Sequence, residues 1–428
     1  MLNQSEREKI AALIKREVVP AMGCTEPVAV SLAVAKATEI LGSLPTHINA
    51  RLSGNIIKNA MGVGIPGTGM IGLPIAIALG ALIGKSEYGL EVLKEVSAQA
   101  VQKGREYISE GRISINHATD APSNLYIEIS VKDADDKTAR AIISCEHTHF
   151  VRLEDNGTII LDEEYDASST QTSQQEEELT LSKVWDYATE SPIEELSYIL
   201  QARDLNLAAA ETALSGDFGH SLGATIRKYG IKYYGDTPVE HMISLTSAAC
   251  DARMGGAPIA VMSNSGSGNQ GITATMPVVS FAKDMNVSED QLIRALVLSH
   301  LTSIYIKQSL GRLSALCGCV VASTGASAAI VYLMGGGYNE VCSAVKNMVA
   351  NLTGMICDGA KPSCAMKISS GVSTAMMSAM LAMNGKCVTS AEGIVSDDVD
   401  RTIHNLTSIG REAMTETDRL VLSIMTSK

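Results

Sequence analysis

Aromatic residues are scarce in this chain of 428 residues, where phenylalanine, tryptophan and tyrosine together make up only 4%. Phenylalanine occurs three times and tryptophan once. A core with so few large rings has to be filled by alanine, glycine, methionine and the aliphatic residues, which let helices approach one another closely. The composition therefore predicts closely packed helices, and the length is sufficient for two or three domains.

An excess of positive charge is also missing. The formal net charge is -13 at pH 7 and no basic cluster stands out, which excludes nucleic acid as an expected partner. Long apolar runs are absent too, because the most apolar stretch, residues 70–84, contains Pro74 and is too short to span a membrane. The first residues lack the apolar segment of a secretory signal. We therefore expect no membrane association.

The chain has nine cysteines, and without a secretory signal they predict a reducing, cytoplasmic location. In such a compartment thiols serve as ligands or catalysts rather than as disulfides. Four cysteines lie on apparent helices or strands and are interpreted as small core residues: Cys145, Cys250, Cys342 and Cys387.

The hydrophobic pattern changes along the chain. Segments 125–131 and 139–145 alternate between apolar and polar residues, which predicts an antiparallel hairpin, whereas 73–83 and 90–107 are expected to be helices. From residue 181 onward, strand signals are scarce and helical periodicity prevails. We predict an α+β fold with three parts: an α+β domain at 1–165, a polar linker at 166–182 and a mainly α-helical domain at 183–428 that carries the metal site.

Two cysteines, Cys357 and Cys364, enclose a segment that contains Gly359 and Pro362. Glycine and proline favour a tight loop over a continuous helix. Ser363 is placed to cap a helix over residues 364–383, so Cys364 would lie in its first turn. Two thiols on such a loop predict a metal or cluster site. A third thiol is needed, and the best source of it is the sequence LCGC at residues 316–319.

Another cysteine, Cys24, precedes the segment Thr25-Glu26-Pro27, which is typical of the start of a helix. Backbone N–H groups and the helix dipole at this position stabilise a thiolate and lower the pKa of the thiol. The alternative interpretation is a buried cysteine that merely packs at a helix end.

Two glycine-rich stretches were considered as ligand loops. Residues 62–67 match the pattern GxGxxG, but Pro66 cannot donate a backbone N–H to a phosphate, so we reject a dinucleotide site. Residues 262–271, MSNSGSGNQG, offer many backbone and side-chain donors and suit an anion such as a substrate carboxylate. A flexible linker is the alternative, but the apolar flanks of this stretch favour a buried loop.

Taken together, these stretches resemble the L-cysteine desulfidase family, which belongs with the iron–sulfur L-serine dehydratases of the serine dehydratase alpha-chain superfamily. The resemblance rests on four motifs that are spread over most of the chain: GCTEP at 23–27, SNSGSGNQGI at 263–272, LCGC at 316–319 and CDGAKPSCAMKIS at 357–369. The match to the serine dehydratases proper is more remote, because those differ around the last cysteine pair.

The resemblance implies a [4Fe–4S] cluster held by Cys317, Cys357 and Cys364, with one iron left open to the substrate. Cys24 would be the base that removes the substrate α-proton. An open iron can act as a Lewis acid and accept the leaving thiol. The implied function is a lyase independent of pyridoxal phosphate that converts L-cysteine to pyruvate, ammonia and hydrogen sulfide. The resemblance also implies a homodimer.

Two alternatives stay open at this point. An L-serine dehydratase would use the same cluster and differ in pocket contacts that the sequence does not show. A non-catalytic protein with a structural zinc or iron–sulfur site would need a fourth ligand, which Cys319 or a histidine could supply. The expected partner is a small amino-acid substrate, and the residues expected to contact it are Asn55, Asn264, Ser265, Ser267 and Lys367.

Overall fold

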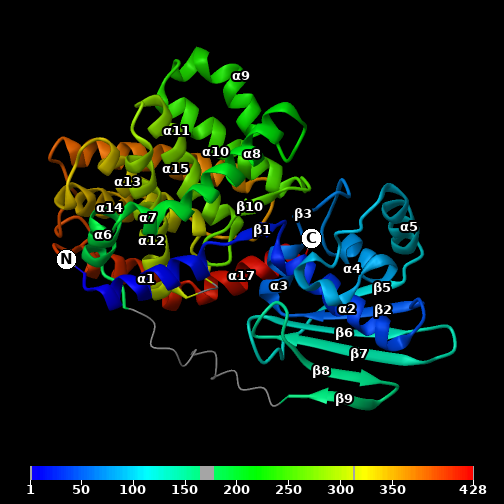
Figure 1. Ribbon diagram of the computed structural model, residues 1–428. Coiled ribbons are helices and arrows are strands. Elements are labelled where there is room, and N and C mark those ends of the chain that lie inside the picture. The colour runs from blue at the N-terminus through cyan, green and yellow to red at the C-terminus, as the bar shows by residue number, and fades with distance from the viewer. Residues whose placement is uncertain (1, 164–177, 312–313, 428) are drawn as a thin grey trace.

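The computed structural model describes residues 2–163, 178–311 and 314–427. An N-terminal region with a mixed β-sheet lies at one end of the molecule, and a largely helical C-terminal part lies at the other (Figure 1). The predicted fold class is therefore confirmed. The linker predicted at 166–182 falls mainly on residues outside the described ranges, and the domain bounds stay a prediction.

The sheet has six strands in the order β5-β2-β6-β7-β8-β9. Strands β2 and β5 run parallel, and every other neighbouring pair is antiparallel. The predicted hairpin is present as β6 and β7, whereas β5, β8 and β9 were not predicted. The strand bounds are β2 (His47–Leu52), β5 (Ile113–His117), β6 (Tyr126–Lys132), β7 (Thr138–Ser144), β8 (Phe150–Asp155) and β9 (Thr158–Asp162).

Helices cover one face of the sheet. Helix α2 (Thr25–Leu41) packs between the sheet and α4 (Leu73–Ile83), and eleven of its 17 residues are buried. Alternate residues of each strand point toward these helices, so the covered face is apolar. The helix predicted at 73–83 is confirmed. The one predicted at 90–107 is wrong, because α5 (Ala98–Ser109) begins only after Ser97, whose side chain caps it.

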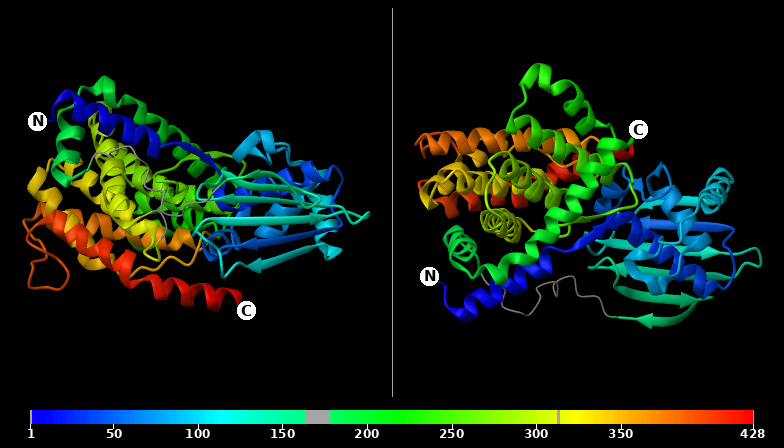
Figure 2. Two further views of the ribbon diagram at one scale, coloured as in Figure 1. Left: turned by 90° about the horizontal axis from the view of Figure 1, so that it is seen from below. Right: turned by 45° about the horizontal axis from the view of Figure 1, so that its top comes forward.

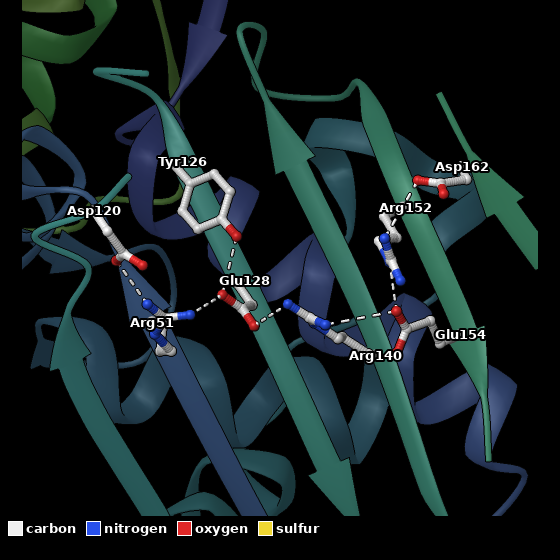
Figure 3. Close-up of polar contacts among 8 residues, drawn as sticks. All are labelled: Arg51, Asp120, Tyr126, Glu128, Arg140, Arg152, Glu154 and Asp162. Atoms are coloured by element: carbon white, nitrogen blue, oxygen red, sulfur yellow. Dashed lines mark hydrogen bonds and ion pairs between the residues drawn. The ribbon is translucent and has the colours of Figure 1, made fainter. Parts of the chain in front are cut away.

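No helix among the described residues covers the other face of the sheet, which carries a row of ion pairs (Figures 2 and 3). Glu128 lies at the centre, with Arg51 Nη1 at 2.7 Å and Arg140 Nη2 at 2.5 Å from its two carboxylate oxygens. Tyr126 also donates a hydrogen bond to it at 3.0 Å. Because its neighbours cover it, the Glu128 side chain is only 6% exposed. The carboxylate thus bridges two arginines on the strands that flank β6.

Helices α10, α11, α12, α13 and α15 form the centre of the C-terminal part and pack closely. Ser299 on α12 donates to the carbonyl of Ala274 on α11 at 2.6 Å, and Ser327 on α13 donates to Ala375 on α15 at 2.9 Å. Such short side chains reach a neighbouring backbone only where helices approach closely, as the lack of aromatics predicted. The bounds are α10 (Pro238–Met254), α11 (Gly268–Asp284), α12 (Glu289–Leu310), α13 (Gly318–Leu333) and α15 (Cys364–Met383).

The remaining helices surround this centre. Their bounds are α6 (Leu181–Glu190), α7 (Ile193–Leu196), α8 (Leu200–Ser215), α9 (Leu222–Tyr234), α14 (Tyr338–Leu352) and α16 (Val399–Ser408).

Among the described residues, no helix combines the length and the apolar character that a membrane span requires.

Both ends of the chain cross between the two parts. Helix α1 (Gln4–Glu17) buries Ile10 and Ile14 in the core of the helical part. Helix α17 (Thr415–Thr426) runs back to the sheet region, as Figure 1 shows, and Asp418 forms an ion pair with the buried Lys58 of α3 (Gly54–Ala60). These crossings hold α3 and the segment between α1 and α2 against the helical part.

Replacing Glu128 by alanine should lower the free energy of unfolding by about 1–3 kcal/mol, because Arg51 and Arg140 would lose their shared charged hydrogen-bond acceptor. Thermal unfolding followed by circular dichroism measures the change. As a control, Glu416→Ala removes the exposed pair with Arg419 and should leave stability unaltered within error. Equal effects of the two variants would contradict the importance of the partly buried network.

Candidate active site

The motifs that are far apart in the sequence meet where the sheet region faces the helical part. Strand β1 (Pro20–Met22) pairs antiparallel with β10 (Ala260–Met262). Just beyond this pairing, the backbone N–H and the hydroxyl of Ser263 both donate to the carbonyl of Val19, at 2.9 and 2.6 Å. The segment that leads to Cys24 is therefore fixed beside the polar loop at residues 262–271.

The two cysteine motifs are joined in the same way. Leu316 and Ile356 form an isolated antiparallel bridge, in which the Cys317 N–H donates to Met355 at 3.0 Å and the Cys357 N–H donates to Ala315 at 2.6 Å. Cys317 is opposite Met355, which is two residues from Cys357. Since residues two apart on a strand point to the same side, Cys317 and Cys357 share one side of the bridge.

Cys364 begins helix α15, whose bounds are those predicted. Ser363 occupies the capping position, but its side chain makes no capping hydrogen bond. The loop before it depends on Gly359, whose φ of 92° is one that glycine readily adopts. A Cβ at Gly359 would also collide with the carbonyl of Lys58. The cysteine loop is thus pressed against the backbone of α3.

The three predicted ligands are free thiols gathered around the loop. Burial and, after it, the charge of Cys357 raise the pKa of Cys317 to about 12. Burial also raises the pKa of Cys364, and Cys357 adds to the effect. Such mutual effects require short separations. The three thiols therefore lie near one another, and their role as ligands stays a prediction.

This donor set suits a cluster better than a single ion. Within the described ranges, no group of three histidine, cysteine, aspartate or glutamate side chains is arranged to hold one metal ion. An iron–sulfur cube is wider than an ion, so its thiolate ligands stand farther apart, and thiolates are its usual ligands. By the chemistry of their donors, Cys317, Cys357 and Cys364 fit a cluster that keeps one iron without a protein ligand.

Cys319 is the neighbour that could be mistaken for a ligand. Its sulfur lies 3.0 Å from the carbonyl of Lys367, to which the thiol donates, and packs against Gly371 of α15. These contacts engage its thiol with the α15 backbone. The geometry therefore favours Cys317 over Cys319 as the ligand from LCGC.

Cys24 occupies the capping position of α2 and is buried, without a side-chain capping bond. Burial raises the pKa of its thiol to about 12, which is opposite to the direction expected from the helix N-terminus alone. The positive charge of the nearby Arg253 guanidinium acts to lower the pKa, and the charges of Glu26 and Cys364 act to raise it. Cys24 therefore lies near the cysteine loop. Burial and the neighbouring charges determine whether its thiol is protonated.

Arg253 is the residue of this site that the sequence reasoning missed. Its Nη2 donates to the carbonyl of Gly23 at 3.1 Å, and its Nη1 donates to Asn269 Oδ1 at 3.1 Å. It therefore connects α10 with both the loop of Cys24 and the start of α11. An arginine near the end of a helix whose last turns, SAACDARM, are mainly small and apolar apart from Asp251 was the available signal.

The polar loop at 262–271 is buried, which excludes the flexible-linker alternative. The Asn264 amide is fully engaged, since its oxygen accepts from Ser265 and Gln270 at 2.9 Å each and its nitrogen donates to His300. The hydroxyl of Ser267 caps α11 by accepting from the Gln270 N–H. These side chains hold the loop in place.

The two other predicted substrate contacts lie near the cysteines or on α3. Lys367 forms an ion pair with Asp358 and donates to the carbonyl of Ile356 at 2.9 Å, so its ammonium is already engaged. Asn55 lies in the first turn of α3, one turn before Lys58. The structure thus places both in the region of the site.

Two open hollows in the surface lie elsewhere. One is bordered by Lys36, Glu39, Lys85, Ser86, Glu87 and Phe150, and the other by Gln4, Arg7, Glu8, Ala11, Lys15 and Glu195. Neither is lined by a cysteine or a histidine. The meeting point of the motifs is therefore the better candidate for chemistry.

The buried His300 makes the stability of the polar loop depend on pH. Its ring accepts from Asn264 at Nδ1 and lies 2.9 Å from Thr275 Oγ1 at Nε2, an arrangement that suits the neutral form. Burial lowers its pKa to about 3. Because the unfolded histidine takes up a proton near pH 6.5 and the folded one does not, His300 stabilises the fold fully above pH 6.5, and this contribution is lost as the pH falls toward 3.

Between pH 6.5 and 5.5, the parent protein should therefore lose about 1 kcal/mol more unfolding free energy than His300→Gln, which cannot titrate. Urea unfolding followed by the fluorescence of Trp185, the single tryptophan, measures this difference. The same pH dependence in both proteins would show that His300 is not the responsible group.

Comparisons with known proteins agree with this arrangement. The model of a family described as serine dehydratase alpha chain matches residues 87–423. A UPF0597 protein of Phocaeicola vulgatus is 61% identical over 430 residues, covering 100% of this chain and 99% of the relative. UPF0597 proteins of Porphyromonas gingivalis (100% of each chain) and Oleidesulfovibrio alaskensis (97% of each) are 52% and 48% identical. The matched family is known for iron–sulfur enzymes and points to a dehydratase-like or lyase-like activity. The chain therefore belongs to the serine dehydratase alpha-chain family.

Proposed function

We propose that this protein is an iron–sulfur-dependent lyase, independent of pyridoxal phosphate, that converts L-cysteine to pyruvate, ammonia and hydrogen sulfide. The observation that carries the proposal is the gathering of Cys317, Cys357 and Cys364 near Cys24, from three separate stretches of the chain. Family membership supports a lyase. The resemblance adds a homodimer to the proposal, and the cysteine content adds a cytoplasmic location.

Cys317, Cys357 and Cys364 would hold a [4Fe–4S] cluster. When bound, a cluster with three thiolate ligands supplies a Lewis-acidic iron that favours departure of the thiol group. The ammonium of Lys367 lies close enough to Cys317 and Cys364 to lower the pKa of both thiols, and Asp358 holds it there. We therefore assign Lys367 a second role, which is to stabilise the thiolate forms of Cys317 and Cys364. This role is in addition to the substrate contact that the sequence suggested.

Cys24 would be the base that takes the α-proton of the substrate. Its burial keeps the thiol protonated in the free protein, while Arg253 and the incoming substrate ammonium favour the thiolate, whose proton passes to solvent before the reaction. As the Cys24 thiolate takes the α-proton, the electrons of the Cα–H bond form the Cα=Cβ double bond, and the electrons of the Cβ–S bond leave with sulfur as hydrosulfide. The aminoacrylate product tautomerises to an imine, which water hydrolyses to pyruvate and ammonia.

L-serine is the second candidate substrate, and the description of the matched family favours it. The same residues would then expel hydroxide in place of hydrosulfide. L-cysteine is favoured by the motifs that resemble the L-cysteine desulfidase family, at residues 23–27, 263–272, 316–319 and 357–369. The ratio of kcat/KM for the two amino acids decides between them.

Replacing Cys317, Cys357 or Cys364 by alanine should remove iron and activity together, because each thiolate holds a different corner of the cluster. Iron content after anaerobic purification and turnover of L-cysteine measure the effect. Cys319→Ala is the matched control and should keep its iron, since its thiol is engaged by the α15 backbone. A full cluster in Cys317→Ala, with loss in Cys319→Ala, would reverse the assignment. Zinc in the parent would favour a structural site.

Replacing Cys24 by serine should leave the iron content unchanged but reduce turnover by a factor of about 10²–10⁴, the usual contribution of a positioned base. The variant should also lose exchange of the substrate α-proton with deuterium from solvent, measured by proton NMR. Exchange at the parental rate would assign the base to another residue. Loss of iron would instead make Cys24 a ligand.

A further inference from the structure

Arg253 is a buried cation without a carboxylate partner. It is only 7% exposed, and its Nη1 and Nη2 atoms donate to neutral oxygens, those of Asn269 and Gly23. Its Nε atom has no acceptor, and none of the ion pairs among the described residues includes it. Burying an unpaired charge is costly unless it gains a counter-ion. Arg253 thus lacks a counter-ion among its protein neighbours, and an anionic ligand could supply one.

The guanidinium lies where two helices begin. Its Nη2 contacts Gly23, just before the start of α2, and its Nε and Cζ atoms lie against Gly268, the first residue of α11. A Cβ at Gly268 would collide with the guanidinium, so this close approach requires glycine. Helix N-termini attract negative charge through their free N–H groups and dipoles. The guanidinium and the N-termini of α2 and α11 therefore favour the same anionic group.

A second buried polar atom lacks a partner on the same turn of α11. The side-chain oxygen of Gln270 has no hydrogen bond and lies near Gly318, the residue after Cys317. An unpartnered donor on α10 and an unpartnered acceptor on α11 together suit a molecule that has both a carboxylate and an ammonium group. An α-amino acid has both.

We propose that Arg253 binds the α-carboxylate of the amino-acid substrate, an inference that rests on the proposed function. Arg253 donates to the carbonyl of Gly23, the residue directly before Cys24, and the substrate Cα is bonded directly to the carboxylate carbon. A carboxylate on Arg253 therefore brings the α-proton to the proposed base. Asn264, Ser265 and Lys367, which the sequence suggested for this contact, already have protein partners.

The test compares ligands with and without the carboxylate. L-alanine has the carboxylate and the ammonium but no leaving group, and L-alaninamide replaces the carboxylate by a neutral amide. Anaerobic calorimetry on the iron-loaded protein measures the affinity for each. The parent should prefer L-alanine. Arg253→Lys should bind L-alanine about 10- to 100-fold more weakly, as expected for losing a charged hydrogen-bond pair, with little change for L-alaninamide.

Two further variants separate binding from folding. Arg294→Lys alters a partly buried arginine of α12 that donates only to the carbonyls of Ala188 and Ser191, at 3.0 Å each, and should keep the parental preference. Gly268→Ala keeps the charge but displaces the guanidinium, so it should reduce the preference as Arg253→Lys does. If Arg253→Lys does not fold, Gly268→Ala still tests whether the guanidinium binds the carboxylate.

The outcomes distinguish the inference from the proposed function. An unchanged preference for L-alanine in Arg253→Lys and Gly268→Ala, or equal binding of both ligands by the parent, would overturn the role of Arg253. A preference that depends on Arg253 in a protein that turns over neither L-cysteine nor L-serine would support the carboxylate site and overturn the proposed function. A structural role alone would weaken both ligands equally.

Discussion

The candidate site depends on one buried cation, the guanidinium of Arg253. It is hydrogen-bonded to the loop before α2 and to the first turn of α11, and it is the group that opposes burial in setting the pKa of Cys24. A charge in such a place has to be held on all sides, because water cannot solvate it there. The pairing of β1 with β10 and the glycine at position 268 provide this close fit.

A second constraint joins the cysteine loop to the sheet region. Gly359 lies against the Lys58 carbonyl of α3, and α3 is itself held by the ion pair between Lys58 and Asp418 near the end of the chain. The thiols contributed by the helical part therefore depend on contacts with the sheet region. This arrangement places the proposed base and the proposed ligands beside the same interface, within one packed cluster.

Low aromatic content has a structural consequence in this family member. Helices rich in alanine, glycine and serine approach closely enough for hydroxyl groups to bond across the contacts, as Ser299 and Ser327 do. Buried polar groups are satisfied in this way. Buried side-chain atoms without a partner occur in both parts of the described chain, and two of them, Arg253 Nε and Gln270 Oε1, lie beside the candidate site. These are the two atoms that the proposed substrate would satisfy.

By itself, the sequence determined the fold class, the helices at 73–83 and 364–383 and the cysteines to consider, because these follow from local periodicity, from glycine and proline in short loops and from the motifs of a family. Tertiary structure alone decided which distant motifs meet, since the pairing of β1 with β10 and the bridge between Leu316 and Ile356 join residues far apart in the chain. It also reversed the expected pKa shift of Cys24, because burial outweighs a helix dipole. Arg253 was identified only from the structure, since its meaning lies in having no carboxylate nearby.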